Sequence, residues 1–366
     1  MAATMKSIHA QIDIHRSSGF HLETDIEIKH GEITALYGPS GSGKSSVLRI
    51  IAGLDHLSNG VTVKTDTETW NDSNVFVPTH LRGIGYVFQH AQLFPHLSVE
   101  GNLQYAIARR HQQTDIELEQ VKQWLGIDSL LKKPISQLSG GELQRVSIAR
   151  VLLNGAKALL MDEPLGALDQ QARRRILPYI DELHDRLDFP FLYVSHAIEE
   201  VTYLADKIYL LEEGSVRNFG STFEISSSIE LNAREGDAAA AMVQCEIVSF
   251  DYSYNLTQLD FEGQRILVSG NRRGHNRTLK VRIPARDVSL TLGKSEDSSI
   301  LNILSGQVEQ IVQSPEDTSA LVRIKVGQQV ILSRITRRSL DKLQIKEGQQ
   351  VFAQIKSVGL LSDYGS

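Results

Sequence analysis

The chain has 366 residues, of which 41% are hydrophobic and 22% charged, so it is long enough for two or three globular domains. Its formal net charge of −6 argues against a general nucleic-acid-binding protein, which usually carries a basic surplus, and we expect no nucleic-acid partner. The single cysteine, Cys245, excludes an intramolecular disulfide and fits a reducing compartment. No apolar run reaches about 18 residues, so the sequence predicts no transmembrane span.

The most informative segment is a glycine-rich loop near the N-terminus. It reads G-P-S-G-S-G-K-S and consists of Gly38, Pro39, Ser40, Gly41, Ser42, Gly43, Lys44 and Ser45. This matches G-x-x-x-x-G-K-[ST], in which glycines bring backbone N–H groups close to phosphate oxygens. Lys44 is placed to reach the outer phosphates, and Ser45 to offer its hydroxyl to Mg²⁺. The flanking residues predict a strand before the loop and a helix from Ser46 to Ala52, so we expect bound ATP and Mg²⁺.

Residues 1 to about 220 alternate short apolar runs with helical segments, which indicates an α/β domain. The runs are apolar throughout, as expected of parallel strands that are covered on both faces. The predicted strands are 34–37, 84–88, 158–161 and 191–195, and the segments 115–125 and 173–187 have helical spacing.

Two carboxylates, Asp162 and Glu163, follow the predicted strand 158–161. In open α/β sheets, ligands bind at the carboxyl ends of the strands. Asp162 suits a Mg²⁺ site, through a water molecule, because Mg²⁺ prefers oxygen ligands and keeps several waters. Glu163 is placed to accept a proton from an attacking water or to orient it.

The segment L-S-G-G-E-L-Q-R lies just upstream of this strand. Ser139, Gly140 and Gly141 open a predicted helix from Glu142 to Leu153, and the free N–H groups of a helix N-terminus attract phosphate. Together with the phosphate loop, this segment resembles the signature of ATP-binding-cassette (ABC) ATPases. The resemblance implies that the signature of one subunit closes over ATP held by the phosphate loop of another, and therefore a homodimer.

The same resemblance implies roles for three further residues. Gln89, in Y-V-F-Q, is similar to the loop glutamine that touches Mg²⁺ and the attacking water. Asp169, in A-L-D, is similar to the loop at the dimer interface, and His196, in Y-V-S-H, resembles the histidine that contacts the γ-phosphate. The implied catalytic residues are thus Glu163, His196 and Gln89, and the implied metal ligands are Ser45, Asp162 and Gln89. For the residue that stacks on adenine, the candidates are His15, Phe20 and His21, of which Phe20 is favoured.

The composition changes after Gly220. Residues 223–244 contain serine and alanine runs and are interpreted as a linker with a short helix. Alternating segments such as 278–283 and 321–326, separated by glycine turns, then predict an all-β domain. We therefore expect a P-loop cassette ATPase domain at 1–235 with a helical signature subdomain. A small barrel-like β-domain of the Mop/TOBE, OB-like type should follow at 245–366.

Several features favour an importer ATPase over other ABC proteins. The chain has one cassette and no predicted membrane span, and residues 92–99 resemble the segment of importer ATPases that faces the permease. The resemblance implies a separate integral membrane permease, an indirect periplasmic solute-binding partner and a position on the cytoplasmic face of the inner membrane. An ATPase acting on nucleic acid or the ribosome, and a non-hydrolysing oxyanion-binding protein, are the alternatives from other classes.

The wording of the motifs is most similar to ATPases of molybdate importers, and importers of sulfate, sugar or polyamine are the close alternative. In the β-domain, Ser299, Asn302, Lys356 and Ser357 are candidate donors to a tetrahedral oxyanion. The alternative for these four residues is ordinary polarity at turns and strand ends, and a purely regulatory domain.

Overall fold

The computed structural model describes residues 5–16, 19–57, 59–110, 114–271, 278–294, 297–313, 318–356 and 359–360. They form two compact units, of which the first ends at Ser221 and the second begins at Thr222. Within the described ranges, no helix combines the length and apolar character needed to cross a bilayer.

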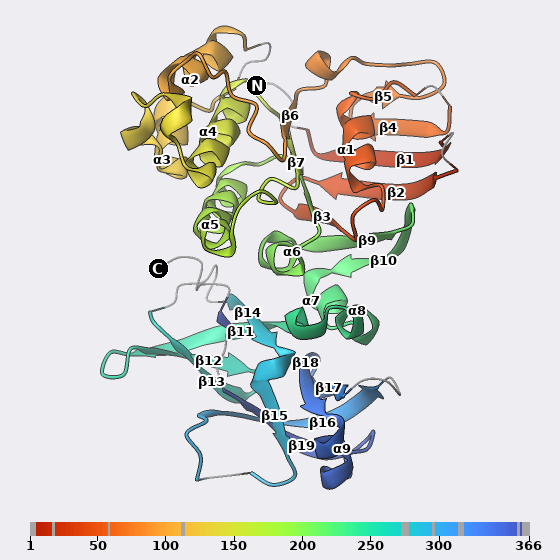
Figure 1. Ribbon diagram of the computed structural model, residues 1–366, viewed down its shortest axis with the longest axis vertical. Helices are drawn as coiled ribbons and strands as arrows, with labels where there is room; N and C mark the ends of the chain where they lie inside the picture. Colours follow the sequence, from red (N-terminus) through yellow and green to blue (C-terminus); the bar gives the residue numbers. More distant parts are fainter. Residues whose placement is uncertain are drawn as a thin grey trace. The chain divides into compact units, whose positions relative to one another are not determined.

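The first unit is built on a ten-stranded mixed sheet in the order β5-β4-β1-β2-β10-β9-β3-β8-β7-β6 (Figure 1). Its strands are β1 (Ser7–His15), β2 (His21–Lys29), β3 (Ile33–Tyr37), β4 (Val61–Thr65), β5 (Thr69–Asn71), β6 (Ile84–Val87), β7 (Ala158–Asp162), β8 (Phe191–Ser195), β9 (Lys207–Glu212) and β10 (Ser215–Ser221). Its helices are α1 (Lys44–Ala52), α2 (Val99–Ala108), α3 (Leu118–Leu125), α4 (Gly140–Leu153), α5 (Gln170–Arg186) and α6 (Ile198–Leu204).

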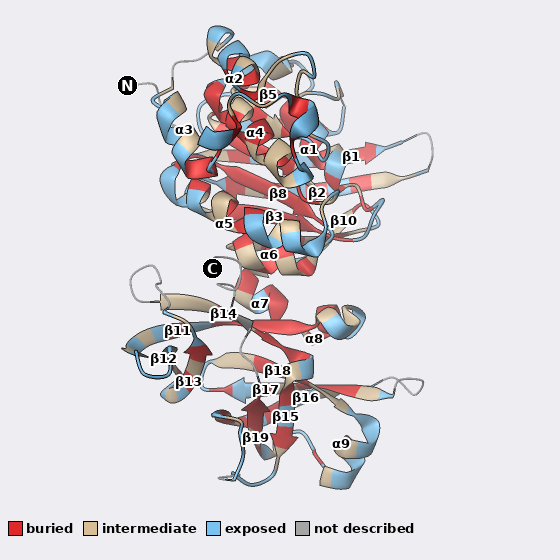
Figure 2. Ribbon diagram, turned by 60° about the vertical axis from the view of Figure 1, so that its left-hand side comes forward, coloured by how far each residue is buried: buried red, intermediate tan, exposed pale blue. Residues whose placement is uncertain are grey.

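The four predicted strands lie side by side as β3, β8, β7 and β6, and all their pairings are parallel. β3 and β8 are buried along their whole length, as their continuous apolar sequence predicts (Figure 2). Because the carboxyl ends of parallel strands meet at one edge, the loops after these four strands gather at the same place. Strands β9 and β10 and the antiparallel strands β1, β2, β4 and β5 form the other part of the sheet, and none of these six was predicted from the sequence.

The helices of the first unit form two groups. α1 follows the phosphate loop and packs against β7, whereas α2 and α3 pack on α4 beside the sheet (Figure 1). α3 begins at Leu118 rather than at residue 115, because Glu117 closes a capping box there with Gln120. α5 begins at Gln170, three residues before the predicted start, because the Asp169 side chain accepts from Ala172 N and caps the helix.

The second unit contains two five-stranded antiparallel sheets, in the orders β13-β12-β11-β14-β20 and β15-β19-β16-β17-β18. Its strands are β11 (Ala240–Asp251), β12 (Leu256–Phe261), β13 (Gln264–Ser269), β14 (Thr278–Pro284), β15 (Val288–Thr291), β16 (Asn302–Val312), β17 (Ser319–Val326), β18 (Gln329–Thr336), β19 (Gln350–Ile355) and β20 (Gly359–Leu360). Its helices are α7 (Thr222–Ser226), α8 (Ile229–Arg234) and α9 (Arg337–Leu343).

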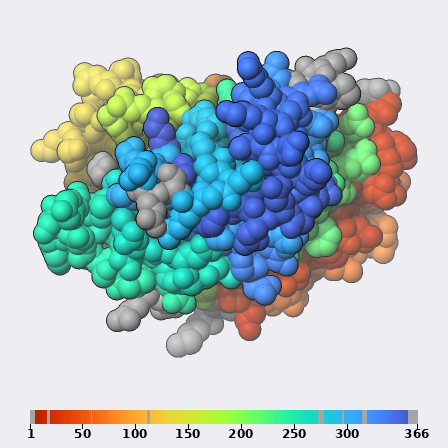
Figure 3. Space-filling view, turned by 90° about the horizontal axis from the view of Figure 1, so that it is seen from below, coloured from red at the N-terminus to blue at the C-terminus, as the bar shows by residue number. Residues whose placement is uncertain are grey.

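One hydrophobic core joins these two sheets, with Val243 and Ile283 from the first and Val322 and Ala353 from the second. Figure 3 shows one face of this unit, from the teal of β11 and β12 to the blue of the last strands. The predicted all-β domain is therefore confirmed. Residues 223–244 are not a linker, however. They form α7, α8 and the start of β11, because their apolar side chains, including Ile225 and Ile229, are buried.

Candidate active site

The glycine-rich loop connects β3 to α1, which confirms the predicted order of strand, loop and helix. The helix begins at Lys44, two residues before the predicted start. Gly43 has a φ of 104°, a conformation that costs glycine little and other residues much. A Cβ on Gly38 would lie 2.0 Å from the carbonyl oxygen of Leu211, so the backbone passes where no side chain fits.

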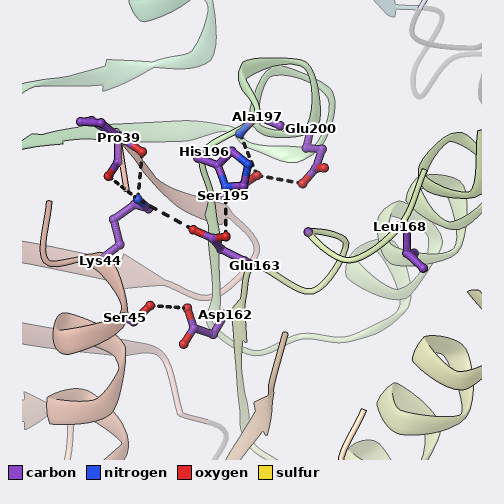
Figure 4. Close-up of polar contacts among 12 residues, drawn as sticks. Pro39, Lys44, Ser45, Asp162, Glu163, Leu168, Ser195, His196, Ala197 and Glu200 are labelled. Carbon is purple, nitrogen blue, oxygen red and sulfur yellow. Dashed lines mark hydrogen bonds and ion pairs between the residues drawn. The ribbon is translucent and has the colours of Figure 1, made fainter. Parts of the chain in front are cut away.

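Lys44 is folded back over this loop. Its Nζ donates to the carbonyl oxygens of Gly38 and Pro39, both at 2.8 Å, and lies 3.9 Å from Glu163 Oε1 (Figure 4). Burial lowers the pKa of Lys44, while the nearby carboxylates oppose this effect. Because hydrogen bonds between charged groups are stronger than those to neutral carbonyls, a phosphate group competes well for this ammonium.

Asp162 ends β7 with both carboxylate oxygens engaged. Ser45 Oγ donates to Oδ1 and the Tyr86 hydroxyl donates to Oδ2, each at 2.8 Å. Burial and the neighbouring carboxylate raise the pKa of Tyr86, so its hydroxyl keeps its proton at neutral pH. Ser45 and Asp162 thus place two hard oxygen groups side by side, which is the donor type that Mg²⁺ requires.

Tyr86 had no predicted role. β6 and β7 pair in parallel with Tyr86 opposite Leu160, so Asp162 lies two residues further along on the same face. The sequence could have indicated this contact only if β6 and β7 were known to be neighbouring strands.

Glu163 and His196 face each other across the carboxyl ends of β7 and β8. His196 Nδ1 lies 3.0 Å from Glu163 Oε2, and the opposite oxygen of Glu163 points toward Lys44 (Figure 4). The side chain of Glu163 is 18% exposed and that of His196 is 44% exposed. Glu163 has a φ of 43°, a left-handed conformation that is unfavourable for a glutamate and is held by its position between strand and loop.

Gln89 approaches the same place from the end of β6. Its side chain is exposed, and its Nε2 lies 3.1 Å from the point that a Cβ on Gly166 would occupy. Glu163 Oε2 lies 3.5 Å from that same point. Gln89 is therefore beside the loop that begins with Glu163.

Of these side chains, Lys44, Ser45 and Glu163 line a pocket of about 300 Å³, whereas Asp162, His196 and Gln89 do not. Its lining includes much of the phosphate loop, with Ser40, Gly41, Gly43, Lys44 and Ser45, together with Glu163. Two residues from the β1–β2 hairpin, Arg16 and Phe20, complete one wall, whereas His15 and His21 do not line it. Ser42 is buried, and its Oγ has no hydrogen-bond partner among the described residues.

The predicted signature residues have local roles of their own and do not line this pocket. Ser139 caps α4 and forms a capping box with Glu142, whose carboxylate accepts from Ser139 N at 2.8 Å. Gly140 and Gly141 form the first turn of that helix, and Asp169 caps α5. Within one chain, the pocket therefore unites the phosphate loop and Glu163, while the signature and Asp169 lie elsewhere on the unit.

A buried network behind His196 was also not predicted. The Glu200 carboxylate accepts from Tyr193 Oη at 2.9 Å and from Ser195 Oγ at 2.8 Å, and Ser195 Oγ accepts in turn from Ala197 N. Arg173 Nη1 lies 3.4 Å from the other Glu200 oxygen. These contacts fix the backbone on both sides of His196.

The candidate oxyanion-binding residues of the second unit differ in their exposure and hydrogen bonding. The Asn302 amide donates to Leu267 O at 3.0 Å and accepts from Leu267 N at 2.7 Å, so it ties β16 to β13. Ser299 and Lys356 are exposed, and Ser357 lies outside the described residues. Asn302 is therefore a structural residue, and the other two described candidates remain predictions.

The fold and this pocket define an ATP-binding-cassette ATPase. Residues 23–166 match the family model described as ABC transporter, and residues 298–361 match that of the TOBE domain. The structure of cbiO1 from Clostridium perfringens, part of the ABC transporter complex cbiONQ, is similar with a TM-score of 0.53 and 27% identity, covering 63% of this chain and 94% of that one. The dimeric bacterial cassette MJ0796 gives a TM-score of 0.50 and 27% identity over 59% of this chain and 98% of its own.

Curated relatives match almost the whole chain. The molybdenum import ATP-binding protein ModC of Methylococcus capsulatus is 43% identical over 98% of this chain and 100% of its own length. ModC 1 of Azotobacter vinelandii is 43% identical over 94% of this chain and 96% of its own. The chain belongs to this family of molybdenum import ATP-binding proteins.

Proposed function

We propose that this protein hydrolyses ATP to drive molybdate import through a separate membrane permease. The hydrolytic part rests on one observation, the convergence of Lys44, Asp162, Glu163 and His196 at the carboxyl edge of the sheet. The assignment of molybdate as the solute rests on the full-length similarity to ModC proteins, which are named for molybdenum import.

In the proposed mechanism, the loop N–H groups and Lys44 bind the β- and γ-phosphates, and Phe20, whose ring lies beside Gly43, offers that ring to the base. Ser45 and Asp162, with Gln89 as a further ligand, would hold Mg²⁺, which would supply positive charge beside the phosphates. Glu163 orients the attacking water and receives its proton. His196 holds the Glu163 carboxylate in place and donates toward the γ-phosphate.

The pocket of a single chain supplies half of this site. We infer that Ser139, Gly140, Gly141 and Asp169 of a second copy complete it, because they sit at helix N-termini that lie outside the pocket of their own chain. ATP then favours the closed homodimer, and hydrolysis removes the charge that holds the two copies together. The similarity to a dimeric cassette supports this arrangement.

The proposed setting is the cytoplasmic face of the inner membrane, where the homodimer binds the permease. A periplasmic solute-binding protein delivers molybdate from the other side and is an indirect partner. For the second unit we propose a regulatory role, in which Ser299 and Lys356 supply polar contacts. The same machine serving sulfate, a sugar or a polyamine is the competing proposal.

Glu163→Gln tests the hydrolytic assignment. With Mg-ATP, this variant should form a stable dimer on size-exclusion chromatography. Its hydrolysis rate should fall by a factor of about 10²–10³, as expected when a group acting in the transition state is removed. Asp169→Asn, which retains the helix cap, should dimerise less well without changing nucleotide affinity of the monomer. Parental turnover by Glu163→Gln would refute the role of Glu163.

The solute is tested separately by uptake. Cells that lack this gene should lose high-affinity molybdate uptake and recover it with the parental gene, but not with Glu163→Gln. Sulfate, sugar and polyamine uptake measured in the same cells should not change. If uptake of one of those solutes were lost instead, that solute would replace molybdate in the proposal, and the ATPase assignment would stand.

A further inference from the structure

A cluster of histidine and aspartate side chains lies at the turn end of the β1–β2 hairpin, outside the pocket lining. The antiparallel register places His15 directly opposite His21, and Asp13 lies two residues before His15 on the same strand face. One ligand atom from each of Asp13, His15 and His21 lies within 4.8 Å of those of the other two. The sheet register, rather than sequence proximity, brings the three together.

We propose that Asp13, His15 and His21 bind a divalent transition-metal ion such as Zn²⁺. Imidazole nitrogen and carboxylate oxygen are ordinary zinc ligands, and three protein ligands with a water in the fourth position are a common zinc arrangement. Mg²⁺ does not compete well for such a site, because it prefers a set of oxygen ligands. This site is therefore chemically distinct from the oxygen groups of Ser45 and Asp162.

The present contacts require only small movements to accept the ion. His21 Nε2 lies 2.8 Å from Asp13 Oδ1, and these two atoms need to separate only slightly to reach the roughly 3.3 Å between two ligand atoms of one tetrahedral zinc ion. The rings of His15 and His21 are stacked, with centroids 4.0 Å apart and 9° between their planes. One ring must rotate to point its nitrogen at a shared ion, and both side chains are at the surface, where rotation is cheap.

A metal ion at this location would lie next to a wall of the nucleotide pocket. His15 and His21 bracket the hairpin turn that carries Arg16 and Phe20, two residues of the pocket wall. Arg16 N also donates to Phe20 O at 2.8 Å, so these two residues are tied to each other next to the histidines. An ion that joins both strands at this point restrains that wall, and we expect it to change the affinity for adenine nucleotides.

Titration of the full-length, tag-free protein with ZnCl₂ tests the proposal, in buffer that contains excess Mg²⁺ and no nucleotide. The expected result is one bound Zn²⁺ per chain, measured by isothermal titration and by metal content after dialysis. His15→Ala and His21→Ala should each weaken binding by about tenfold or more, and Asp13→Asn by less.

His9→Ala is the matched control. His9 lies on the same strand face and pairs with Asp25 at 2.6 Å, but it is outside the cluster, so its loss should leave zinc affinity unchanged. The side chains are exposed, and unchanged melting temperatures without metal would show that the variants fold. The proposal is overturned if the parent binds no Zn²⁺ at micromolar concentrations, or if a His15→Ala/His21→Ala double variant binds it like the parent.

Discussion

Arg173 and Glu200 meet at 3.4 Å and link two loops of the active site from behind. Arg173 Nε also donates to Leu168 O at 2.8 Å, in the loop that follows Glu163. Glu200, which is buried, accepts from Ser195 Oγ next to His196. The pair therefore couples the position of the Glu163 loop to the position of His196, although neither residue lines the pocket.

Arg173→Met or Glu200→Gln should lower kcat for ATP by about tenfold or more, because small displacements of reacting groups cost large factors in rate. The KM for ATP should change little, since the phosphate loop is untouched. Steady-state ATPase kinetics give this comparison. Arg186→Met, which removes an exposed pair with Glu182 on the same helix, should leave both constants unchanged. Parental kcat in both network variants would show that the pair serves stability alone.

Tyr86→Phe should raise the Mg²⁺ concentration needed for half-maximal ATPase activity by about three- to tenfold. The variant removes the hydrogen bond to Asp162 Oδ2, worth roughly 1–3 kcal/mol to a charged acceptor, and leaves Asp162 less well oriented. Magnesium titrations at saturating ATP measure the effect. The control is Tyr254→Phe, because this tyrosine is 76% exposed in the second unit. An unchanged magnesium requirement would show that the hydrogen bond from Tyr86 to Asp162 has no effect on metal binding.

Gly38→Ala should destabilise the protein by about 3 kcal/mol or more, because its Cβ would collide with the backbone of β9 rather than with a movable side chain. Thermal unfolding followed by circular dichroism measures the loss. Gly293→Ala adds the same methyl group where no atom lies within 4 Å and should have little effect. Equal melting temperatures for both variants would mean that the loop adjusts freely.

Arg82→Met should also destabilise the protein, by on the order of 3 kcal/mol. Arg82 is buried and donates to the carbonyl oxygens of Ile50 and Ile51 in the last turn of α1, and to Val77 O. Its removal strands these acceptors away from water. Burial lowers the pKa of Arg82 to about 10, so it still carries its charge at neutral pH. Chemical denaturation compares it with Arg49→Met, whose exposed pair with Asp55 should contribute less than about 1 kcal/mol. A similar loss for both variants would contradict this account of Arg82.

The sequence by itself determined the phosphate loop, the four parallel strands β3, β8, β7 and β6 and the carboxylate pair, since each is encoded by neighbouring residues whose chemistry and spacing carry the signal. The motifs predict five site residues that the structure brings together, namely Lys44, Ser45, Asp162, Glu163 and His196. Their catalytic roles stay predictions.

The tertiary structure decided which distant residues support that pocket. Tyr86, Arg173 and Glu200 act through strand and helix neighbours that no local pattern reveals, and Asn302 proved to bind backbone. The His15–His21 cluster arises in the same way, from a hairpin register set by which face of the strands is buried. Local chemistry can be read along a chain, but the meeting of separate segments depends on how the whole sheet buries its apolar faces.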